Sequence, residues 1–541
     1  MHADALPAEG SWDVVVVGFG AAGASAALQA AEEGARVLVL ERFDGGGSTR
    51  RCGGVIYAGG GTPAQRAAGF ADRPEHMLAY LRRETRGEAD PEALEAFCAR
   101  SRVDLAWLAA HGLDFPTAFH PHKSVVPPEG TGLYYSGNEH GGPPPQAPRG
   151  HLPDGHGQRG KEIFAGLARA VRTAGIEVRT RHRVTRLLRD GAGRVTGVEA
   201  LRLPGAGPAA AAHDALFGAA LASRAAMGPL GAFERRLGRP TTFGARGGVV
   251  LAAGGFAFDV RMLAEYAPAF RGCMPLGTPG DDGAGIRLGA EAGGALDAMD
   301  RCAAWRFMYP PEAFLRGVLV NARGERFCDE SQYGATVGRN ISEQPGGHAW
   351  LVVDAAVVRA VRAEAAADER LRDRPLGELV RGQANDLVFR KLSTALNLAV
   401  NRRKARTAAG LERACGLPVG ALERTLAEHN ARAHAGGPDP FGKPAALLTP
   451  LEEPPFLAIV CDLDSKLFLG PCFTLGGLRT HALSGAVLDA QRAPIPGLYA
   501  AGRNAVGLCT GGYVSGLSIA DCVFAGRNAG RSAARAVTAP T

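Results

Sequence analysis

Apolar and polar positions near the N-terminus follow the order strand, turn, helix, strand. Residues 13–17 (D-V-V-V-V) include a continuous apolar run, which is typical of a parallel strand buried on both faces. Residues 18–23 hold three glycines and predict a tight turn, and an Ala-rich stretch to about residue 33 predicts a helix. Residues 36–40 (R-V-L-V-L) then predict a second strand. This order indicates an α/β fold.

Two more buried strands are predicted far downstream. Residues 247–251 lead into a glycine turn, and residues 497–500 precede a glycine-rich loop and a helix over about 518–534. Short strands at 176–179 and 195–199 are assigned to a smaller sheet. We therefore predict that both ends of the chain build one domain around an inserted α+β catalytic or capping domain. The predicted limits are 8–295 and 453–541 for the first domain and 296–452 for the inserted one.

Residues 203–240 differ in character from their neighbours and are predicted to be an insertion. Their apolar side chains recur at helical spacing, which predicts one apolar stripe. Two interpretations are open: packing on the protein's own flank, which we favour, or peripheral contact with a membrane surface, where lipophilic molecules partition. The stripe comprises Leu216, Phe217, Leu221, Met227, Leu230 and Phe233.

Composition narrows the class of protein. A chain of 541 residues is too long for one compact core, so two or more lobes are expected. The net charge is +7 with dispersed Arg residues, and no nucleic-acid partner is predicted. The ten cysteines show no C-x-x-C pair and no metal-like spacing, and no run of 18 apolar residues occurs. With no secretory pattern at the N-terminus, these features predict a cytoplasmic protein with reduced cysteines and no bound metal.

The glycine turn carries the G-x-G-x-x-G spacing of dinucleotide-binding domains. Gly18 permits the tight turn, Gly20 lets backbone amides approach a pyrophosphate, and Gly23 lets the helix pack close to the strand. The helix that follows offers unpaired N–H groups to the phosphates. Glu41 ends the next strand about twenty residues on and is expected to accept hydrogen bonds from ribose hydroxyls. The pattern predicts a Rossmann-type domain, which NAD and FAD enzymes share.

Three further segments indicate which of the two cofactors is bound. They are residues 41–54, which contain E-R-F-D-G-G-G-S-T, residues 251–255 (L-A-A-G-G) and residues 498–503 (L-Y-A-A-G-R). This set resembles the fumarate reductase/succinate dehydrogenase flavoprotein family over nearly the whole chain. In that family a Gly-Ser-Thr loop contacts the pyrophosphate and flavin, and a C-terminal A-G-x element reaches the isoalloxazine ring. The resemblance implies FAD, bound by Gly18, Gly20, Ala22, Gly23, Glu41, Arg42, Gly47, Ser48, Thr49, Gly53, Gly54, Val184, Ala253, Gly254, Gly502, Arg503 and Ser518.

Three charged or titratable groups of that family are replaced in this chain. Fumarate reductases bind a small dicarboxylate with cationic side chains, because two buried carboxylates need charge partners. Gly334 stands where the family pattern has its catalytic Arg. Phe473 stands where the family has a His, and Tyr513 where it has a loop Arg. A dicarboxylate would find no counter-charge at these positions, so we predict a larger, flatter and more lipophilic substrate.

Within this family the chain looks most like the bacterial 3-ketosteroid Δ4-(5α)-dehydrogenase group. The segments that carry this likeness are residues 53–63, 134–139, 147–151 and 511–516. The resemblance implies FAD-dependent removal of two hydrogens from carbons 4 and 5 of a 3-oxo steroid, with Tyr333, Tyr513 and Ser515 as catalytic residues. Hydroxyl donors acidify a hydrogen alpha to a ketone, and the beta hydrogen leaves as hydride to the flavin. We assign Tyr513 to the ketone oxygen and Ser515 and Tyr333 to the carbon 4 proton, with the division of roles left open.

Other functions stay open at this point. A Δ1 ketosteroid dehydrogenase, or a flavin enzyme that acts on another cyclic enone, would use the same hydroxyl donors. A flavoprotein without catalysis of its own would bind FAD that no ketone reduces. No second dinucleotide motif and no C-x-x-C-H motif occur, so neither NAD(P)H nor a fused c-type haem is predicted. The electron acceptor is not specified, and a quinone is one candidate.

Overall fold

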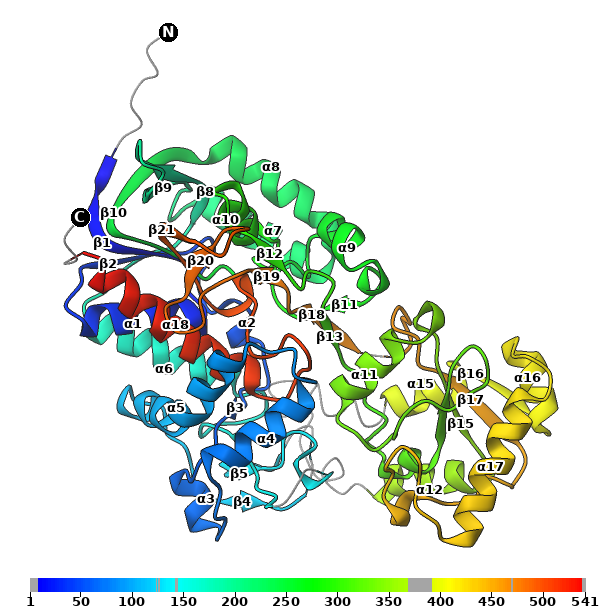
Figure 1. The fold of residues 1–541 in the computed structure, drawn as a ribbon. Helices are drawn as coiled ribbons and strands as arrows, with labels where there is room; N and C mark the ends of the chain where they lie inside the picture. The colour runs from blue at the N-terminus through cyan, green and yellow to red at the C-terminus, as the bar shows by residue number, and fades with distance from the viewer. Residues whose placement is uncertain are drawn as a thin grey trace. The chain divides into compact units, whose positions relative to one another are not determined.

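The computed structural model describes residues 8–122, 124, 127–141, 145–367, 392–468 and 470–537. Contacts between residues divide the chain into two compact units. The first unit contains Met1–Ala267, Pro275–Cys302 and Phe473–Thr541, and therefore draws on both ends of the chain (Figure 1). The second unit contains Pro268–Met274 and Ala303–Cys472.

An eight-stranded sheet forms the centre of the first unit (Figure 1). The strand order is β20-β21-β10-β1-β2-β7, and β9 pairs with β10 and β8 with β9. The strands from β21 to β7 in this order are parallel, whereas β20, β9 and β8 are antiparallel to their partners. The strands are β1 (Ala8–Val17), β2 (Val37–Leu40), β7 (Glu177–Arg179), β8 (His182–Arg189), β9 (Val195–Arg202), β10 (Arg239–Leu251), β20 (Ala486–Leu488) and β21 (Pro494–Ala500).

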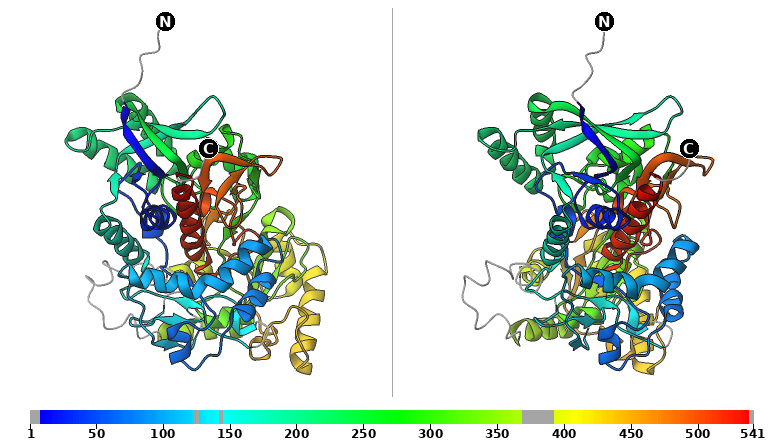
Figure 2. Two further views of the ribbon diagram at one scale, coloured as in Figure 1. Left: turned by 60° about the vertical axis from the view of Figure 1, so that its left-hand side comes forward. Right: turned by 90° about the vertical axis from the view of Figure 1, so that its left-hand side faces the viewer.

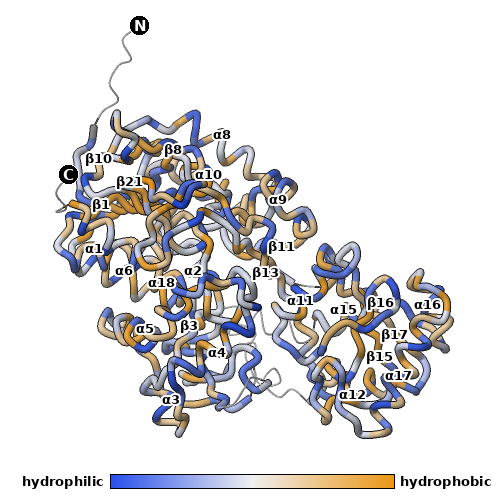
Figure 3. Tube along the Cα trace, viewed as in Figure 1, coloured by the Kyte–Doolittle hydropathy of each residue, from blue (hydrophilic) through white to orange (hydrophobic). Residues whose placement is uncertain are grey.

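The pattern-based strand predictions hold for the buried strands. Val14, Val15 and Val16 are fully buried, as expected of a strand covered on both faces, and Figure 3 shows the apolar colouring of β1 and β21. The assignment of 176–179 and 195–199 to a smaller sheet was wrong. The strand β7 pairs with β2 and β9 pairs with the first half of β10, so both belong to the main sheet. Short strands carry no sequence signal that identifies their pairing partner.

The N-terminal and C-terminal helices pack side by side against this sheet (Figures 1 and 2). They are α1 (Ala21–Glu32) and α18 (Leu517–Arg535). A Cβ atom at Gly526 would collide with the carbonyl oxygen of Ala22, and one at Gly530 with that of Ala26. Glycine therefore allows the two backbones to approach closely, which fixes the C-terminal segment beside the first glycine turn.

Smaller elements complete the first unit. Four two-residue strands form a sheet in the order β3-β6-β5-β4, and β12 pairs with β19. These strands are β3 (Ile56–Tyr57), β4 (Phe119–His120), β5 (Leu133–Tyr134), β6 (Gly150–His151), β12 (Leu296–Asp297) and β19 (Gly477–Leu478). The helices are α2 (Gly47–Arg50), α3 (Pro63–Ala67), α4 (Pro74–Glu84), α5 (Pro91–Ala110), α6 (Gly160–Thr173), α9 (Val260–Tyr266) and α10 (Ala284–Glu291).

The segment 203–240 forms two helices between β9 and the first residues of β10. They are α7 (Pro208–Ala222) and α8 (Met227–Leu237). All six side chains of the predicted stripe are buried or half-buried. Four of them, Leu216, Phe217, Met227 and Leu230, pack in one cluster with Phe43. The stripe thus packs on the protein's own flank, as we favoured.

The second unit has its own antiparallel sheet, in the order β14-β15-β17-β16, with helices around it (Figure 1). Its strands are β14 (Val318–Val320), β15 (Trp350–Val353), β16 (Arg402–Ala405) and β17 (Phe456–Val460). Its helices are α11 (Gly334–Ser342), α12 (Ala355–Ala367), α15 (Ser393–Ala399), α16 (Ala408–Cys415) and α17 (Ala421–Ala435). Short strands lie where the chain passes between the units: β11 (Met274–Pro275), β13 (Cys302–Ala304) and β18 (Pro471–Thr474).

The predicted fold class, a Rossmann-type α/β domain with an α+β insertion, is confirmed. Among the helices that the structure describes, none combines the length and apolar character needed to cross a bilayer.

Candidate active site and cofactor site

The glycine turn after β1 has no room for side chains. Gly18 has a φ of +103°, and a Cβ atom there would lie 2.5 Å from the carbonyl oxygen of Ala252. A Cβ at Gly23 would collide with the carbonyl oxygen of Gly18. The turn therefore brings the start of α1 close to the end of β1. Because the first N–H groups of a helix have no partner within the helix, this geometry fits the pyrophosphate of a dinucleotide.

Glu41 lies at the end of β2 and points at this turn. Its carboxylate accepts one hydrogen bond from the backbone N–H of Phe19 and one from that of Phe43, each at 2.8 Å. Burial raises the pKa of Glu41, and these two hydrogen bonds act against that rise. Each carboxylate oxygen keeps a second lone pair for a ribose hydroxyl. The side chain is thus held in place before a ligand binds, which fits its predicted role.

Asp281 forms polar contacts with three of the segments that were predicted to surround the pyrophosphate and flavin. It accepts hydrogen bonds from the Ser48 hydroxyl and the Gly255 backbone N–H, and it forms an ion pair with Arg503 at 2.6 Å. Sequence reasoning missed Asp281. The available signal was the sequence Gly-Asp-Asp-Gly over residues 280–283, because glycine and aspartate together mark a turn or loop.

Asn504 is a second residue that sequence reasoning missed. Its side-chain oxygen accepts from the backbone N–H of Ala253, and its amide donates to the carbonyl oxygen of Gly254 at 3.0 Å. Two predicted cofactor residues are therefore held by the segment after β21. Gly502, also in this segment, lies against Ala22, since a Cβ there would be 2.9 Å from the Ala22 Cβ.

The other predicted cofactor residues occupy the same unit. Thr49 accepts a hydrogen bond from the N–H of Ala21 at 3.0 Å, and a Cβ at Gly20 would face its hydroxyl at 3.4 Å. Gly54 packs on the backbone of Arg159 with no room for a side chain. The remaining positions are Gly47 at the first residue of α2, Gly53 after it, Val184 on β8 and Ser518 in the first turn of α18. Arg42 forms ion pairs with the carboxylates of Glu234 and Asp282.

The loop that carries Tyr513 and Ser515 is fixed from both ends. Gly511 packs against the carbonyl oxygen of Thr85 with no room for a Cβ. Gly516 has a φ of +88°, and its carbonyl oxygen accepts from the N–H of Tyr57 at 3.2 Å. The hydroxyl of Ser136 donates to the carbonyl oxygen of Ser515 at 3.1 Å. The loop is therefore held in place by the surrounding protein, which fits the predicted roles of Tyr513 and Ser515.

Tyr513 is connected to the cofactor residues through aromatic and ionic contacts. Its half-buried ring packs edge to face on Phe473, with ring centroids 5.2 Å apart. The guanidinium of Arg503 lies 5.3 Å from the centroid of the same Phe473 ring, and Arg503 is paired with Asp281. A series of contacts thus connects the glycine-rich loop with the predicted flavin loop, through Tyr513, Phe473, Arg503, Asp281 and Ser48 in turn.

Tyr333 belongs to the second unit, whereas Tyr513 and Ser515 belong to the first. It is buried immediately before α11, and its hydroxyl oxygen accepts a hydrogen bond from the indole N–H of Trp305 at 2.7 Å. A Cβ atom at Gly334 would lie 2.7 Å from the ring of Phe307. Gly334, which stands where the family pattern has its catalytic Arg, therefore has no room for a larger side chain beside Phe307.

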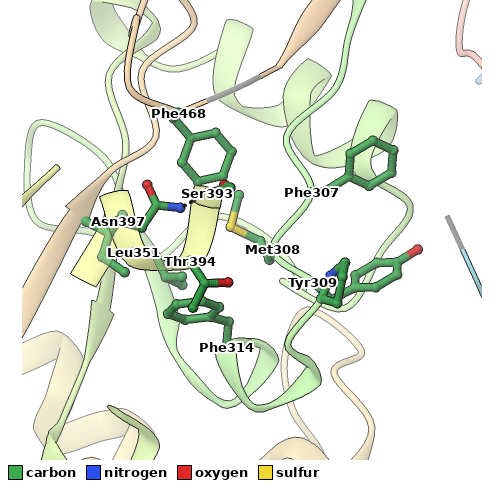
Figure 4. Close-up of a pocket in the computed structure, with 11 residues that line it drawn as sticks. Phe307, Met308, Tyr309, Phe314, Leu351, Ser393, Thr394, Asn397 and Phe468 are labelled. Atoms are coloured by element: carbon green, nitrogen blue, oxygen red, sulfur yellow. Dashed lines mark hydrogen bonds between the residues drawn. The ribbon is translucent and has the colours of Figure 1, made fainter. Parts of the chain in front are cut away.

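Phe307 also lines a pocket of the second unit (Figure 4). Met308, Phe314 and Phe468 contribute apolar surface, and Ser393, Thr394 and Asn397 of α15 contribute polar groups. The lining thus combines aromatic and other apolar side chains with the polar groups of α15. Because Phe307 contacts the ring of Tyr333, with centroids 6.0 Å apart, the pocket lies beside a predicted catalytic residue.

His151 is not suited to act as a base near neutral pH. Its Nε2 is hydrogen-bonded to the hydroxyl of Thr62 at 2.8 Å, and its Nδ1 to the carbonyl oxygen of Arg149 at 3.0 Å. Burial lowers its pKa to about 4, although the carbonyl contact acts against this change. The imidazole is therefore neutral and structural. Among the residues that the structure describes, no cluster of His, Cys, Asp and Glu side chains has the arrangement of a metal site.

Comparison with known proteins gives consistent matches over most of the chain. The family of the FAD binding domain matches residues 13–516. The 3-oxo-5-alpha-steroid 4-dehydrogenase of Comamonas testosteroni is 34% identical over 91% of this chain and 92% of its own. A 3-oxosteroid 1-dehydrogenase of Mycobacterium tuberculosis is 28% identical over 91% of this chain and 92% of its own.

A solved structure shows the same relation. The 3-ketosteroid-Δ4-(5α)-dehydrogenase of Rhodococcus jostii RHA1, in complex with 4-androstene-3,17-dione, is 33% identical and has a TM-score of 0.78. The match covers 98% of this chain and 99% of that one. These matches confirm FAD as the cofactor.

Proposed function

We propose that this chain converts a 3-oxo-5α-steroid to the 4-ene. The chain belongs to the FAD-binding family that includes fumarate reductases and ketosteroid dehydrogenases, and it is an FAD-dependent oxidoreductase that acts on CH–CH bonds. The observation that carries this proposal is the uncharged aromatic contact between Tyr513 and Phe473, joined through Arg503 to the flavin loops. The similarity to steroid Δ4-dehydrogenases supports it.

The hydroxyl groups have separable roles in this reaction. The bound FAD supplies the acceptor for the hydride that leaves carbon 5. The Tyr513 hydroxyl donates a hydrogen bond to the ketone oxygen and stabilises the negative charge that develops there. Ser515 or Tyr333 accepts the proton from carbon 4, and the division of this role between them is left open. The N–H of Trp305 donates to the Tyr333 oxygen and favours its deprotonated form, which suits a base.

The first experiment is an anaerobic titration of the purified flavoprotein with a 5α-3-oxo steroid. Loss of the oxidised flavin absorbance at one equivalent, with recovery of the 4-ene, is the expected result. Recovery of the 1-ene would favour the Δ1 alternative. Flavin that no steroid reduces would overturn the steroid assignment and leave FAD binding unaffected, in which case other cyclic enones become the substrates to test.

The roles of the hydroxyl groups are tested by matched Tyr→Phe changes. Tyr513→Phe should lower the rate constant of flavin reduction about 10²–10³-fold, the usual effect of losing one oxyanion donor. Tyr499→Phe, on β21, is the control, because its hydroxyl contacts the backbone of α18. Equal rates for Tyr513→Phe and the control would remove Tyr513 from the catalytic step.

Trp305 provides a test of Tyr333 as a base. Trp305→Phe removes the hydrogen bond that stabilises negative charge on the Tyr333 oxygen, so less of the form that acts as a base should be present at a given pH. The rising limb of the pH dependence of flavin reduction should then move to higher pH. A lower rate with an unchanged pH profile would show that Trp305 acts only through packing.

The electron acceptor is proposed to be a quinone. Stopped-flow reoxidation of the reduced enzyme by a short-chain quinone and by NADP⁺ tests this, and faster reoxidation by the nucleotide would contradict it.

A further inference from the structure

The helices α7 and α8 cover the residues that follow Glu41. The ring of Phe217 on α7 packs on Phe43, with centroids 4.6 Å apart, and the imidazole of His213 stacks on the same Phe43 ring, with centroids 5.5 Å apart and an interplanar angle of 17°. Leu230 on α8 is fully buried in the same cluster. The segment 203–240 therefore packs directly on the residues that follow β2.

Glu234 on α8 is the centre of a buried ionic network. It is fully buried, and its carboxylate accepts hydrogen bonds from Arg42 at 2.8 and 2.9 Å and from Arg183 at 2.9 Å. His213 contacts it through Nε2 at 3.1 Å, while Arg181 donates to His213 Nδ1. This arrangement places the proton of a neutral imidazole on Nε2, where it is donated to Glu234.

The charges in this network are matched. Burial alone would raise the pKa of Glu234, but hydrogen bonds from His213 and Arg42 and the nearby positive charges lower it to about 2. Arg42 also pairs with Asp282 at 2.8 Å. A buried charge without a partner is strongly destabilising, so each member of the network fixes the position of the others.

The network is built from residues adjacent to those predicted to bind the adenosine half of FAD. Arg42 and Phe43 directly follow Glu41, and the N–H of Phe43 holds the Glu41 carboxylate. Arg183 precedes Val184, another predicted cofactor residue. The end of β2 and the start of β8 are thus joined through one carboxylate on α8, and the loop with Asp282 is linked to them through Arg42.

We propose that α7 and α8 form a clamp for the adenosine half of FAD, with Glu234 as the positioning residue. Glu234 acts through Arg42 and Phe43 on Glu41, which binds the ribose. The clamp predicts that loss of Glu234 weakens binding of the adenosine half and leaves binding of the flavin half unchanged. This inference depends on FAD binding alone, so it can fail or hold independently of the steroid substrate.

The test uses the full-length apoprotein and Glu234→Gln, which keeps the shape of the side chain and removes its charge. Calorimetric titration with ADP and with FMN measures the two halves of the cofactor separately. We expect the dissociation constant for ADP to rise at least 10-fold and that for FMN to change less than 2-fold. FAD should also dissociate faster from the variant.

Glu199→Gln on β9 is the matched control, because it removes a carboxylate from an ion pair with the exposed Arg186 in the same unit. Both of its dissociation constants should equal those of the wild type. If Glu234→Gln does not fold, Phe217→Ala provides a second test, since it uncovers Phe43 without changing a charge; the same selective loss of ADP affinity is expected. Unchanged ADP binding, or an equal loss for ADP and FMN, would overturn the proposal.

Discussion

The carboxyl group of Asp521 should make the folded protein less stable as the pH rises from 4 to 7, the opposite of the usual effect of a carboxyl group. It is buried on α18, where one oxygen accepts a hydrogen bond from the N–H of Leu508 at 3.3 Å and lies against Gly507. Burial raises its pKa from an ordinary 3.8 to about 7, and the hydrogen bond acts against this rise. Between these values the folded protein keeps a proton that the unfolded chain has lost. The contribution to stability is therefore complete below pH 4 and is lost as the pH rises to 7.

The magnitude follows from the two pKa values. A separation of this size corresponds to about 4 kcal/mol of unfolding free energy by pH 8, at about 1.4 kcal/mol for each pH unit. Asp521→Asn removes the titration and keeps an amide oxygen for the Leu508 N–H. The variant should therefore gain stability relative to the wild type as the pH rises, and the difference should level off above pH 7.

The assay is thermal melting of the FAD-loaded protein at pH 4.5 to 8.5 and constant ionic strength. For a unit of this size each kcal/mol shifts the melting temperature by about 1 °C, so the variant should melt about 4 °C above the wild type at pH 8. Asp300→Asn, at an exposed position, is the control and should parallel the wild type. A constant difference between Asp521→Asn and the wild type across this range would refute the argument.

Three other substitutions test the described contacts. Burial lowers the pKa of His151 from an ordinary 6.5 to about 4, so its contribution of about 3 kcal/mol to the free energy of unfolding is present above pH 6.5 and lost as the pH falls to 4. His151→Gln should reduce this loss of stability in acid in the same melting assay. An unchanged loss of stability in acid would contradict the prediction. Gly23→Ala places a methyl group against the Gly18 carbonyl, so the protein should purify without flavin absorbance, and a fully loaded variant would disprove the close approach. Arg149→Met leaves Asp72 as a buried unpaired carboxylate and should cost about 3–5 kcal/mol, most of which a second change, Asp72→Asn, should restore in melting experiments.

The sequence pattern predicted the elements that are long, apolar or rich in glycine. The helix α18 lies within one residue of its predicted limits, and α1 ends within one residue of its predicted end but begins at Ala21, inside the predicted turn. Burial on both faces and glycine spacing leave this local signal. The pairing partners of β7 and β9 were not predictable, since pairing is decided by strands up to 140 residues away, and the same pleated pattern fits several partners.

The candidate site shows the same limit. The residues at glycine motifs, such as Ser48 and Arg503, were predicted from their motifs and lie together around Asp281. Asp281 itself was missed because it is 233 residues from Ser48 and no spacing rule connects them. Glu234 was missed for the same reason, since its partners Arg42 and Arg183 precede it by 192 and 51 residues.

The ion pair of Arg503 bears on the choice of substrate. Arg503 is a cation next to Phe473 and Tyr513, and a free guanidinium there would attract a carboxylate. However, its charge is matched by Asp281 at 2.6 Å, and both side chains are mostly buried. A carboxylate at the Tyr513 side would therefore have to compete with an established pair, whereas a ketone needs only the hydroxyl donor. The contacts around Phe473 thus favour a neutral oxo group over an acid, in agreement with the replacement of the family's charged residues by Gly334, Phe473 and Tyr513.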